Sequence, residues 1–360
     1  MRLALLTEIP APYRLPLFRA LARQEGIELR VLYLARADPR RSYPVPEDER
    51  GFEWEVLPGH SVRRGRRWLV FSRGVIAALR RHDPEVVVVG GWNQPAFWQA
   101  LGYARTRGRP LVTWVESTAR DSRSGSVAGN ATRRAFVRGS AAFLVPGRAA
   151  ADYMRSLGVA DARIAVAPNA VDAVRFGRPR CQAPGVGPNR RVRVLYVGRL
   201  SREKGLDVLF EAVTDLPVQV MTAGTGPERT RLEGAAPANV TFLGQLEQDE
   251  LASQYAEAEV FVLPSLSEPW GMVLNEAAAA GLPLVATEAV GAAHDLIEEG
   301  ANGFRVPAGN AQALRDALRR LAEDADLRER AGRRSLELSR RFTPEAWAGA
   351  VAALARRLAG

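Results

Sequence analysis

Lysine, cysteine and histidine are scarce in this sequence of 360 residues. Of its 50 lysine and arginine side chains only Lys204 is a lysine, and Cys181 is the single cysteine. One cysteine excludes an intrachain disulfide and a metal cluster built from several thiolates, and it fits a reducing compartment. The three histidines (His60, His82 and His294) lie far apart in the sequence, which argues against a histidine metal site. We therefore expect no metal.

Long apolar runs are also missing. No run of about 18 apolar residues occurs, so the sequence predicts no membrane-spanning helix. The first residues, MRLALLTEIPAPYR, have an apolar run too short and a proline too early for a signal peptide. We therefore expect a cytoplasmic protein that is at most peripheral to the inner face of a membrane.

The remaining composition is that of an ordinary globular protein, with 47% hydrophobic and 25% charged residues. The length predicts two domains, each large enough for its own core. The net charge of +10 is compatible with a polyanion, an anionic membrane surface or a phosphorylated substrate as partner. Composition does not choose among these three.

Short apolar runs alternate with helical patterns in the first half, which is typical of βαβ units in a parallel sheet. The spacing predicts one doubly wound, Rossmann-like domain over residues 1–176. Its predicted strands are 2–7, 28–34, 85–90, 110–115, 141–145 and 164–168, and its predicted helices include 15–23, 95–107 and 149–157.

A linker precedes a second series of the same kind. Residues 177–190, GRPRCQAPGVGPNR, carry three prolines and three glycines without a hydrophobic period. A second Rossmann-like domain is predicted over 191–343, so the fold class is α/β with two tandem domains facing a central cleft that holds the ligand. Its predicted strands are 192–198, 218–224, 240–244, 260–264 and 283–287, with helices at 206–213, 249–258 and 272–280. A helical tail of 312–323, 327–340 and 344–358 is predicted to follow.

The stretch GRLSREKGLDVLFEAV joins a predicted strand to a helix and contains the single lysine. A strand-to-helix turn offers free backbone N–H groups and the positive end of a helix dipole. With Arg199 and Lys204 added, it can cradle a diphosphate. The glycine pattern is not that of a P-loop, and a solvated loop with a charged face is the alternative.

A second stretch, PSLSEPWGMVLNEAAAAGLPLVAT, places two carboxylates around a helix start. Glu268 follows a strand, the helix begins at Gly271, Met272 and Val273, and Glu276 lies one turn further on. Free N–H groups of the first turn can bind phosphate oxygens, and carboxylates can accept hydrogen bonds from sugar hydroxyls. The alternative for Glu276 is simple complementarity to the helix dipole.

Two further motifs are weaker. Gly224-Thr225-Gly226-Pro227 follows a strand, and a tight turn explains it adequately. Asp324-Ala325-Asp326 matches a metal motif of other transferases, but it lies between two predicted helices. We interpret it as a helix boundary and cap.

Four stretches of the second half resemble, in order and spacing, the donor domain of the retaining glycosyltransferases of family 4, which have the two-domain GT-B fold. They are GRLSREKGLDVLFEAV, TAGTGPERTRLE, VTFLGQL and SLSEPWGMVLNEAAAAGLPLVAT, and they cover residues 192–304. Glu268 and Glu276, with seven residues between them, resemble the paired glutamates of that family, and APNAVDAVRF resembles the end of its first domain.

The resemblance implies a site for a nucleotide diphosphate sugar. Arg199 and Lys204 would bind the diphosphate, Glu276 the ribose and Glu268 the sugar, and the loop from Gly244 to Leu246 would lie near the base. The implied catalytic residues are Arg199, Lys204 and Glu268, and we add Glu116 as a candidate from its position alone. The implied donor-binding residues are Gly198, Arg199, Lys204, Gly224, Gly244, Leu246, Gly271, Met272, Val273 and Glu276.

It also implies a hexosyltransferase that needs neither metal nor another cofactor, because the cations and the helix dipole stabilise the leaving diphosphate. Retention of the anomeric configuration comes from the resemblance alone. Double displacement needs a nucleophilic carboxylate beneath the anomeric carbon. The sequence places none there, so we favour front-face attack in which the leaving diphosphate helps to deprotonate the acceptor.

The first half departs from the family pattern. TEIPAPYRLPLF stands where many members have a glycine-rich loop, and Glu116 aligns where members often have a histidine. Glu116 could be the general base, a hydrogen-bonding partner of the acceptor, or a polar residue that ends a strand. In this fold the last helix returns to the first domain, so we expect residues 344–360 to do so with Trp347 as an apolar anchor.

The acceptor is left open. The run Arg63-Arg64-Gly65-Arg66-Arg67-Trp68 suits an anionic membrane surface and a glycan, polysaccharide or lipid-linked acceptor, while a solvated basic loop is the alternative. A nucleotide-sugar epimerase or hydrolase is possible on the same fold. The charge alone suggests a nucleic-acid binder, but no nucleic-acid-binding motif supports it.

Overall fold

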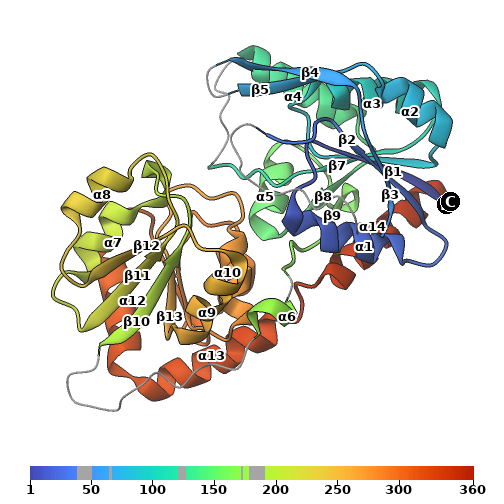
Figure 1. Cartoon of the computed structure of the whole chain (residues 1–360). Helices are drawn as coiled ribbons and strands as arrows, with labels where there is room; N and C mark the ends of the chain where they lie inside the picture. Colours follow the sequence, from blue (N-terminus) through green and yellow to red (C-terminus); the bar gives the residue numbers. More distant parts are fainter. Residues whose placement is uncertain (39–50, 65–66, 121–126, 172, 178–190) are drawn as a thin grey trace.

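The computed structural model describes all residues except 39–50, 65–66, 121–126, 172 and 178–190, so the predicted linker lies almost wholly outside the described residues. Figure 1 shows two α/β lobes, one built from the first half of the chain and one from the second. Each contains a parallel sheet, with seven strands in the first lobe and six in the second. The predicted fold class is confirmed.

The first sheet has the strand order β3-β2-β1-β6-β7-β8-β9. Strands such as β6, VVVV, are buried throughout, because helices cover both faces of a parallel sheet. The strands are β1 (Arg2–Thr7), β2 (Glu28–Tyr33), β3 (Glu53–Val56), β6 (Val86–Val89), β7 (Leu111–Trp114), β8 (Ala142–Val145) and β9 (Ile164–Val166). The helices are α1 (Leu15–Ala22), α2 (Val75–His82), α3 (Pro95–Thr106), α4 (Val127–Gly139) and α5 (Arg148–Ser156), with 3-10 turns η1 (Pro12–Arg14) and η2 (Asp161–Arg163).

The second sheet has the order β12-β11-β10-β13-β14-β15. Its strands are β10 (Val192–Val197), β11 (Val218–Ala223), β12 (Val240–Gly244), β13 (Val260–Leu263), β14 (Leu284–Thr287) and β15 (Gly303–Val306). Its helices are α7 (Leu206–Val213), α8 (Arg229–Ala235), α9 (Gln248–Glu257), α10 (Met272–Ala279), α11 (Ala293–Leu296), α12 (Ala311–Glu323) and α13 (Ala325–Ser339), with the 3-10 turn η3 (Arg202–Lys204). Asp324 caps α13 by accepting a hydrogen bond from the N–H of Leu327 (2.8 Å), as its interpretation as a cap predicted.

In both sheets the direction of strand addition reverses once. The reversal lies between the adjacent strands β1 and β6 in the first sheet, and between β10 and β13 in the second. Ligands of open α/β sheets bind beyond the carboxyl ends of the strands at such switch points. The loops after these four strands are therefore the places to look for the site.

The chain crosses between the two cores twice. Short helix α6 (Ala173–Phe176) packs Phe176 against Tyr255 of the second core, with ring centroids 5.5 Å apart. The C-terminal helix α14 (Pro344–Ala359) then returns to the first domain, where it lies beside α1 (Figure 1). Trp347 is fully buried there, 5.2 Å from Trp114 and 6.0 Å from Phe18 between ring centroids. The predicted return with Trp347 as anchor is confirmed.

The described residues of the basic run belong to an antiparallel hairpin of β4 (Gly59–Arg64) and β5 (Arg67–Ser72), while residues 65–66 of the run lie outside the described residues. The interpretation of Trp68 as an aromatic that faces a membrane is wrong, because Trp68 packs into the core of the first domain and is only 5% exposed. Another register pair of the hairpin, His60 and Phe71, instead stacks its rings on the exposed face, with centroids 5.5 Å apart. Strand alternation explains the exchange, since successive side chains of β5 point to opposite faces.

Candidate active site

The loops after β10 and β11 approach each other backbone to backbone. Gly224 ends β11 with φ 132°, and a side chain on it would place its Cβ 2.0 Å from the carbonyl oxygen of Gly198. The N–H of Gly224 donates to the carbonyl of Gly244 (2.7 Å) at the end of β12. Three of the predicted glycines thus lie where the ends of three neighbouring strands meet. The backbones can approach so closely because Gly224 has no side chain, in agreement with its interpretation as part of a tight turn.

Lys204 and Glu268 come together at the switch point of the second sheet. Lys204 ends η3 in the loop after β10, Glu268 lies in the loop after β13, and their side chains form an ion pair in which each is less than one-fifth exposed. The turn beside Lys204 is tight, because a Cβ on Gly205 would lie 2.2 Å from the carbonyl oxygen of Pro264. The structure therefore brings together two predicted catalytic residues that are 64 positions apart in the chain.

Arg199 leads into the same loop. Its backbone carbonyl accepts a hydrogen bond from the buried hydroxyl of Tyr196 (3.1 Å), which fixes the turn. Its side chain is exposed and forms no ion pair within the part of the chain that the structure describes. Arg199 thus offers an exposed guanidinium in the same loop as Lys204.

Glu268 is positioned by its backbone. Its N–H donates to the carbonyl of Ala289 (3.2 Å), and its carbonyl accepts from the N–H of Gly291 (3.0 Å). These two bonds tie the loop after β13 to the segment that follows β14. Gly271 follows in the same loop and leads into α10, whose first residues Met272 and Val273 are half-buried. The N–H groups of a first helical turn have no acceptor within the helix.

Glu276 lies one turn into α10, and Tyr255 of α9 holds it. The hydroxyl of Tyr255 donates to Oε2 of Glu276 (2.8 Å) and more weakly to the carbonyl of Val273 (3.3 Å). Burial raises the pKa of Glu276 to about 7, although the hydrogen bond from Tyr255 opposes this. A carboxylate kept in such a place is costly to ionise, so dipole complementarity alone does not account for it.

Tyr255 is a site residue that the sequence reasoning missed. In the predicted helix it occupies an apolar position, and its ring is fully buried between Phe176 and Phe261. A single tyrosine on the core face of a helix is interpreted as a packing residue. Its hydroxyl could have indicated a role in the site, since a buried tyrosine O–H needs a hydrogen-bond partner.

Glu116, two residues beyond β7, lies beside the half-buried Arg14. Nη2 of Arg14 lies 3.3 Å from Oε1 of Glu116, and Nη1 donates to Oγ1 of Thr7 (2.8 Å). The guanidinium lies 4.5 Å from the ring centroid of Trp114. Arg14 belongs to the segment that replaces the glycine-rich loop, so the two departures of the first domain from the family pattern contact each other.

The two domains touch next to this site. Arg120, four residues beyond Glu116, pairs with Glu288 after β14 (2.7 Å). Asp295 of α11 accepts a hydrogen bond from the N–H of Arg148 at the start of α5 (2.9 Å). These contacts join loops that follow strands in both sheets, so the predicted cleft edges face each other.

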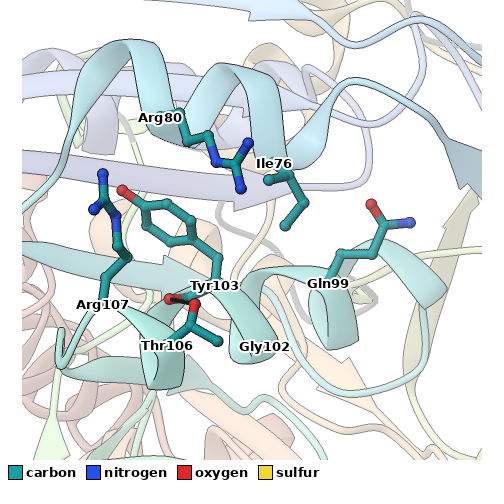
Figure 2. Close-up of a pocket in the computed structure, with 7 residues that line it drawn as sticks. All are labelled: Ile76, Arg80, Gln99, Gly102, Tyr103, Thr106 and Arg107. Atoms are coloured by element: carbon teal, nitrogen blue, oxygen red, sulfur yellow. Dashed lines mark hydrogen bonds between the residues drawn. The ribbon is translucent and has the colours of Figure 1, made fainter.

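Other features lie away from these loops. Leu246 is half-buried beyond β12 and packs on the second core. A pocket between α2 and α3, which Figure 2 shows with Tyr103 beside Arg80 and Arg107, opens on helices rather than at strand ends.

Among the residues described there is no group of three His, Cys, Asp or Glu side chains placed to hold a metal. None of the described helices is long and apolar enough to cross a membrane.

Comparison with known proteins agrees with this geometry. The family described as Glycosyltransferase Family 4 matches residues 16–175, and the family described as Glycosyl transferases group 1 matches residues 183–337. Sulfoquinovosyl transferase SQD2 of Arabidopsis thaliana is 36% identical over 163 residues, which are 43% of this chain and 31% of that longer protein. Glycogen synthase of Mycobacterium tuberculosis (strain ATCC 25618 / H37Rv) is 30% identical over 304 residues, 79% of this chain and 70% of that protein.

A solved structure shares the whole fold. The crystal structure of Anabaena Alr3699/HepE in complex with UDP superposes with a TM-score of 0.78 at 18% identity, covering 99% of this chain and 100% of that one. Both family matches, the glycogen synthase and the two-domain architecture lead to one assignment. The chain belongs to the retaining glycosyltransferases of family 4 and has the GT-B fold.

Proposed function

We propose that the chain binds the diphosphate of a nucleotide sugar between Lys204 and the start of α10, and transfers the sugar to an acceptor hydroxyl. The observation that carries the proposal is the meeting of Lys204 and Glu268 at the switch point of the second sheet, with Glu276 on the adjoining helix. Arg199 and Lys204 supply the positive charge, and the N–H groups of Met272 and Val273 add donors for phosphate oxygens. Glu276 accepts hydrogen bonds from the ribose.

The ion pair gives Glu268 two states. Without donor, its carboxylate neutralises Lys204. When a diphosphate takes up the charge of Lys204, Glu268 is free to accept hydrogen bonds from hydroxyls of the donor sugar. The exchange keeps Lys204 paired with a negative charge at each stage, while Glu268 trades its ion pair for hydrogen bonds from hydroxyls.

The transfer breaks the bond between the anomeric carbon and the diphosphate oxygen and forms a bond from that carbon to the acceptor oxygen on the same face. The acceptor proton passes to the leaving diphosphate, whose negative charge Lys204 and Arg199 stabilise. In this proposal Glu268 accepts hydrogen bonds from the donor sugar and Glu276, held by Tyr255, accepts them from the ribose, so neither carboxylate is assigned as a nucleophile beneath the anomeric carbon. We therefore propose front-face displacement, which retains the anomeric configuration.

A thermal-shift panel of UDP, GDP, ADP and dTDP with their sugars tests the donor. A ligand at 100 times its Kd stabilises the native state by about 2.7 kcal/mol, which raises the melting temperature by a few degrees for a chain of this size. We expect one base to give a clear shift with both diphosphate and sugar nucleotide. An epimerase would convert that sugar nucleotide without acceptor, and equal, negligible shifts for all four bases would contradict a nucleotide-sugar site.

We also propose that the hairpin β4–β5 rests on an anionic membrane surface. Val62 and Phe71, 46% and 38% exposed, form an apolar face with His60 beside the basic run. Apolar side chains flanked by arginines suit the interface of a membrane with anionic lipids. Each basic residue near such a surface contributes about 1 kcal/mol to the binding free energy.

Co-sedimentation with liposomes that contain anionic lipid checks this proposal. We expect V62S/F71S to bind at least tenfold more weakly, because it removes the apolar side chains that would enter the interface. We expect the variant with glutamine at the four arginines of the run to bind at least tenfold more weakly as well, because about 1 kcal/mol per arginine is lost. Leu336→Ser, which removes an exposed apolar side chain on α13, serves as the control. Binding of both hairpin variants at the level of the control would refute the membrane surface.

A further inference from the structure

Two buried side chains, Trp270 and Asn275, bracket the first turn of α10. Gly271 caps the helix, so Trp270 lies just outside its start and Asn275 occupies the fourth helical position. Nε1 of Trp270 donates a hydrogen bond to Oδ1 of Asn275 (2.8 Å). Side chains at these two positions of a helix often pack together and fix the angle at which the chain enters the helix. Here a hydrogen bond joins them, and the turn between them is the one proposed to bind the diphosphate.

The other end of the Asn275 amide reaches the segment that joins the domains. Its Nδ2 donates to the backbone carbonyl of Asn169 (2.9 Å), 106 positions earlier in the chain. Asn169 lies where the chain first crosses between the cores, because Ala170 packs in the first core and Val171 in the second. The orientation of the amide follows from its partners, since an indole N–H only donates and a carbonyl only accepts. Asn275 therefore ties the start of α10 to the first crossing.

Trp270 contacts the second crossing and the first domain. Its ring lies 6.3 Å from that of Phe342, between centroids. Phe342 belongs to the second core, whereas Trp347, five residues later, is buried in the first. Trp270 also lies against the start of α5, because a Cβ on Gly147 would be 2.8 Å from its ring. The pair of Trp270 and Asn275 thus touches both crossings of the chain and the first domain itself.

This junction is buried, unlike the ion pair between the domains. Asn275 and Trp270 are 1% and 4% exposed. Arg120 and Glu288 are each about half exposed, and exposed ion pairs contribute little to stability. A buried amide is costly unless its polar atoms are hydrogen-bonded, and an apolar side chain would fix the helix start without that cost. The bond from Asn275 to the crossing therefore points to a role beyond the helix start.

We propose that Trp270 and Asn275 are positioning residues that set the orientation of the donor-binding turn of α10 relative to the first domain. A diphosphate held by the N–H groups of Met272 and Val273 then presents its sugar to the first domain at a fixed angle. Transfer depends steeply on such alignment of the reacting groups. This catalytic consequence rests on the proposed donor site, whereas the coupling between the turn and the first domain does not.

The spread of distances between the two domains tests this inference. Spin labels on Arg105→Cys of α3 and Glu211→Cys of α7, both at exposed positions, report that spread by double electron–electron resonance in a Cys181→Ser background. Asn275→Leu keeps the size of the side chain and loses both bonds. We expect it to widen the distance distribution about twofold relative to the wild type. Trp270→Phe loses only the indole N–H, so its distribution should lie between the two.

Asn239→Leu is the matched control. Asn239 is also buried, and its Nδ2 donates to the carbonyls of Val213 (2.9 Å) and Val218 (3.2 Å), all within the second domain. This variant should lose thermal stability much as N275L does, because both lose buried hydrogen bonds, but it should keep the wild-type distance distribution. A wild-type distribution in both N275L and W270F would overturn the inference and leave the pair as a local contact at the helix start.

Titration with UDP, GDP, ADP and dTDP separates this inference from the donor site. Asn275 does not itself contact the nucleotide in the proposed site, so the Kd of the diphosphate that binds should change less than about threefold in N275L. A much weaker Kd with an unchanged distance distribution would show that Asn275 acts on the donor turn alone, and would contradict the inference. If none of the four binds to the wild type, the donor site fails, and the distance distributions still decide the coupling.

Discussion

Replacing Lys204 by arginine should lower kcat by about 100-fold, although the charge is kept. Lysine is a compact point charge, whereas the arginine fork is broad and planar. Lys204 lies in a tight turn, paired with Glu268 and less than one-fifth exposed, with no room for a side chain on the next residue. A guanidinium there can keep the ion pair but cannot move between phosphate oxygens at the start of α10. Alanine, which removes the charge altogether, should cost about 1,000-fold.

The same turn supplies the control. Arg202 begins η3 and its side chain is 84% exposed, with only a long contact to Glu228 (3.4 Å). Arg202→Lys should leave kcat and both KM values within twofold. Steady-state kinetics of the three variants decides the matter, and K204R at more than a third of wild-type turnover would make the single lysine an accident of composition.

Donor affinity should rise steeply with pH around neutrality, because burial raises the pKa of Glu276 to about 7. The ionised carboxylate is the form that accepts two hydrogen bonds from the ribose, so protonation below pH 7 weakens binding. Well below the pKa the Kd of the nucleoside diphosphate should fall about tenfold per pH unit, and it should level off near pH 8. Calorimetric titrations at pH 5.5, 6.5, 7.5 and 8.5 measure it.

Two variants attribute the pH dependence to this pair. Glu276→Gln should bind the nucleotide at least tenfold more weakly at pH 8 and lose the slope. Tyr255→Phe should move the midpoint to higher pH, since it removes the hydrogen bond that lowers the pKa of Glu276. A slope that persists in E276Q would show that another group titrates and that Glu276 does not hold the ribose.

The stability of the fold gives an independent test of the raised pKa of Glu276. The folded-state pKa of Glu276 lies above its value in the unfolded chain, so the native state binds the extra proton between about pH 4.5 and 7. The contribution of Glu276 to the free energy of unfolding therefore falls as pH rises through that window. At pH 8 the ligand-free E276Q variant should unfold at higher denaturant concentration than the wild type, and the difference should vanish near pH 4.5.

The fold was predictable where burial is complete. Apolar runs such as VVVV in β6 and VFVL in β13 have to lie between two layers of helices, and both strands were predicted to within two residues. Edge strand β3, EWEV, and the hairpin β4–β5 were not predicted, because their polar residues hide the strand pattern. Trp68 was misread for a related reason, since only the register of β5 decides which of its side chains face the core.

The sequence pointed to individual residues of the candidate site but not to the contacts among them. The loops of Lys204 and Glu268 were expected to share the cleft, and the ion pair between them comes from the strand order, which places β10 beside β13. Arg14 with Glu116, and Tyr255 with Glu276, depend on packing between distant segments. No local pattern in one sequence encodes such pairs.

The central claim is that one diphosphate site lies between Lys204 and the start of α10, and a crystal structure with the nucleoside diphosphate bound tests it most directly. The account predicts phosphate oxygens within hydrogen-bonding distance of Lys204 Nζ and of the N–H groups of Met272 and Val273, with both ribose hydroxyls on Glu276 and Glu268 released from its ion pair. A nucleotide bound elsewhere, or one that leaves the pair of Lys204 and Glu268 intact, would contradict it.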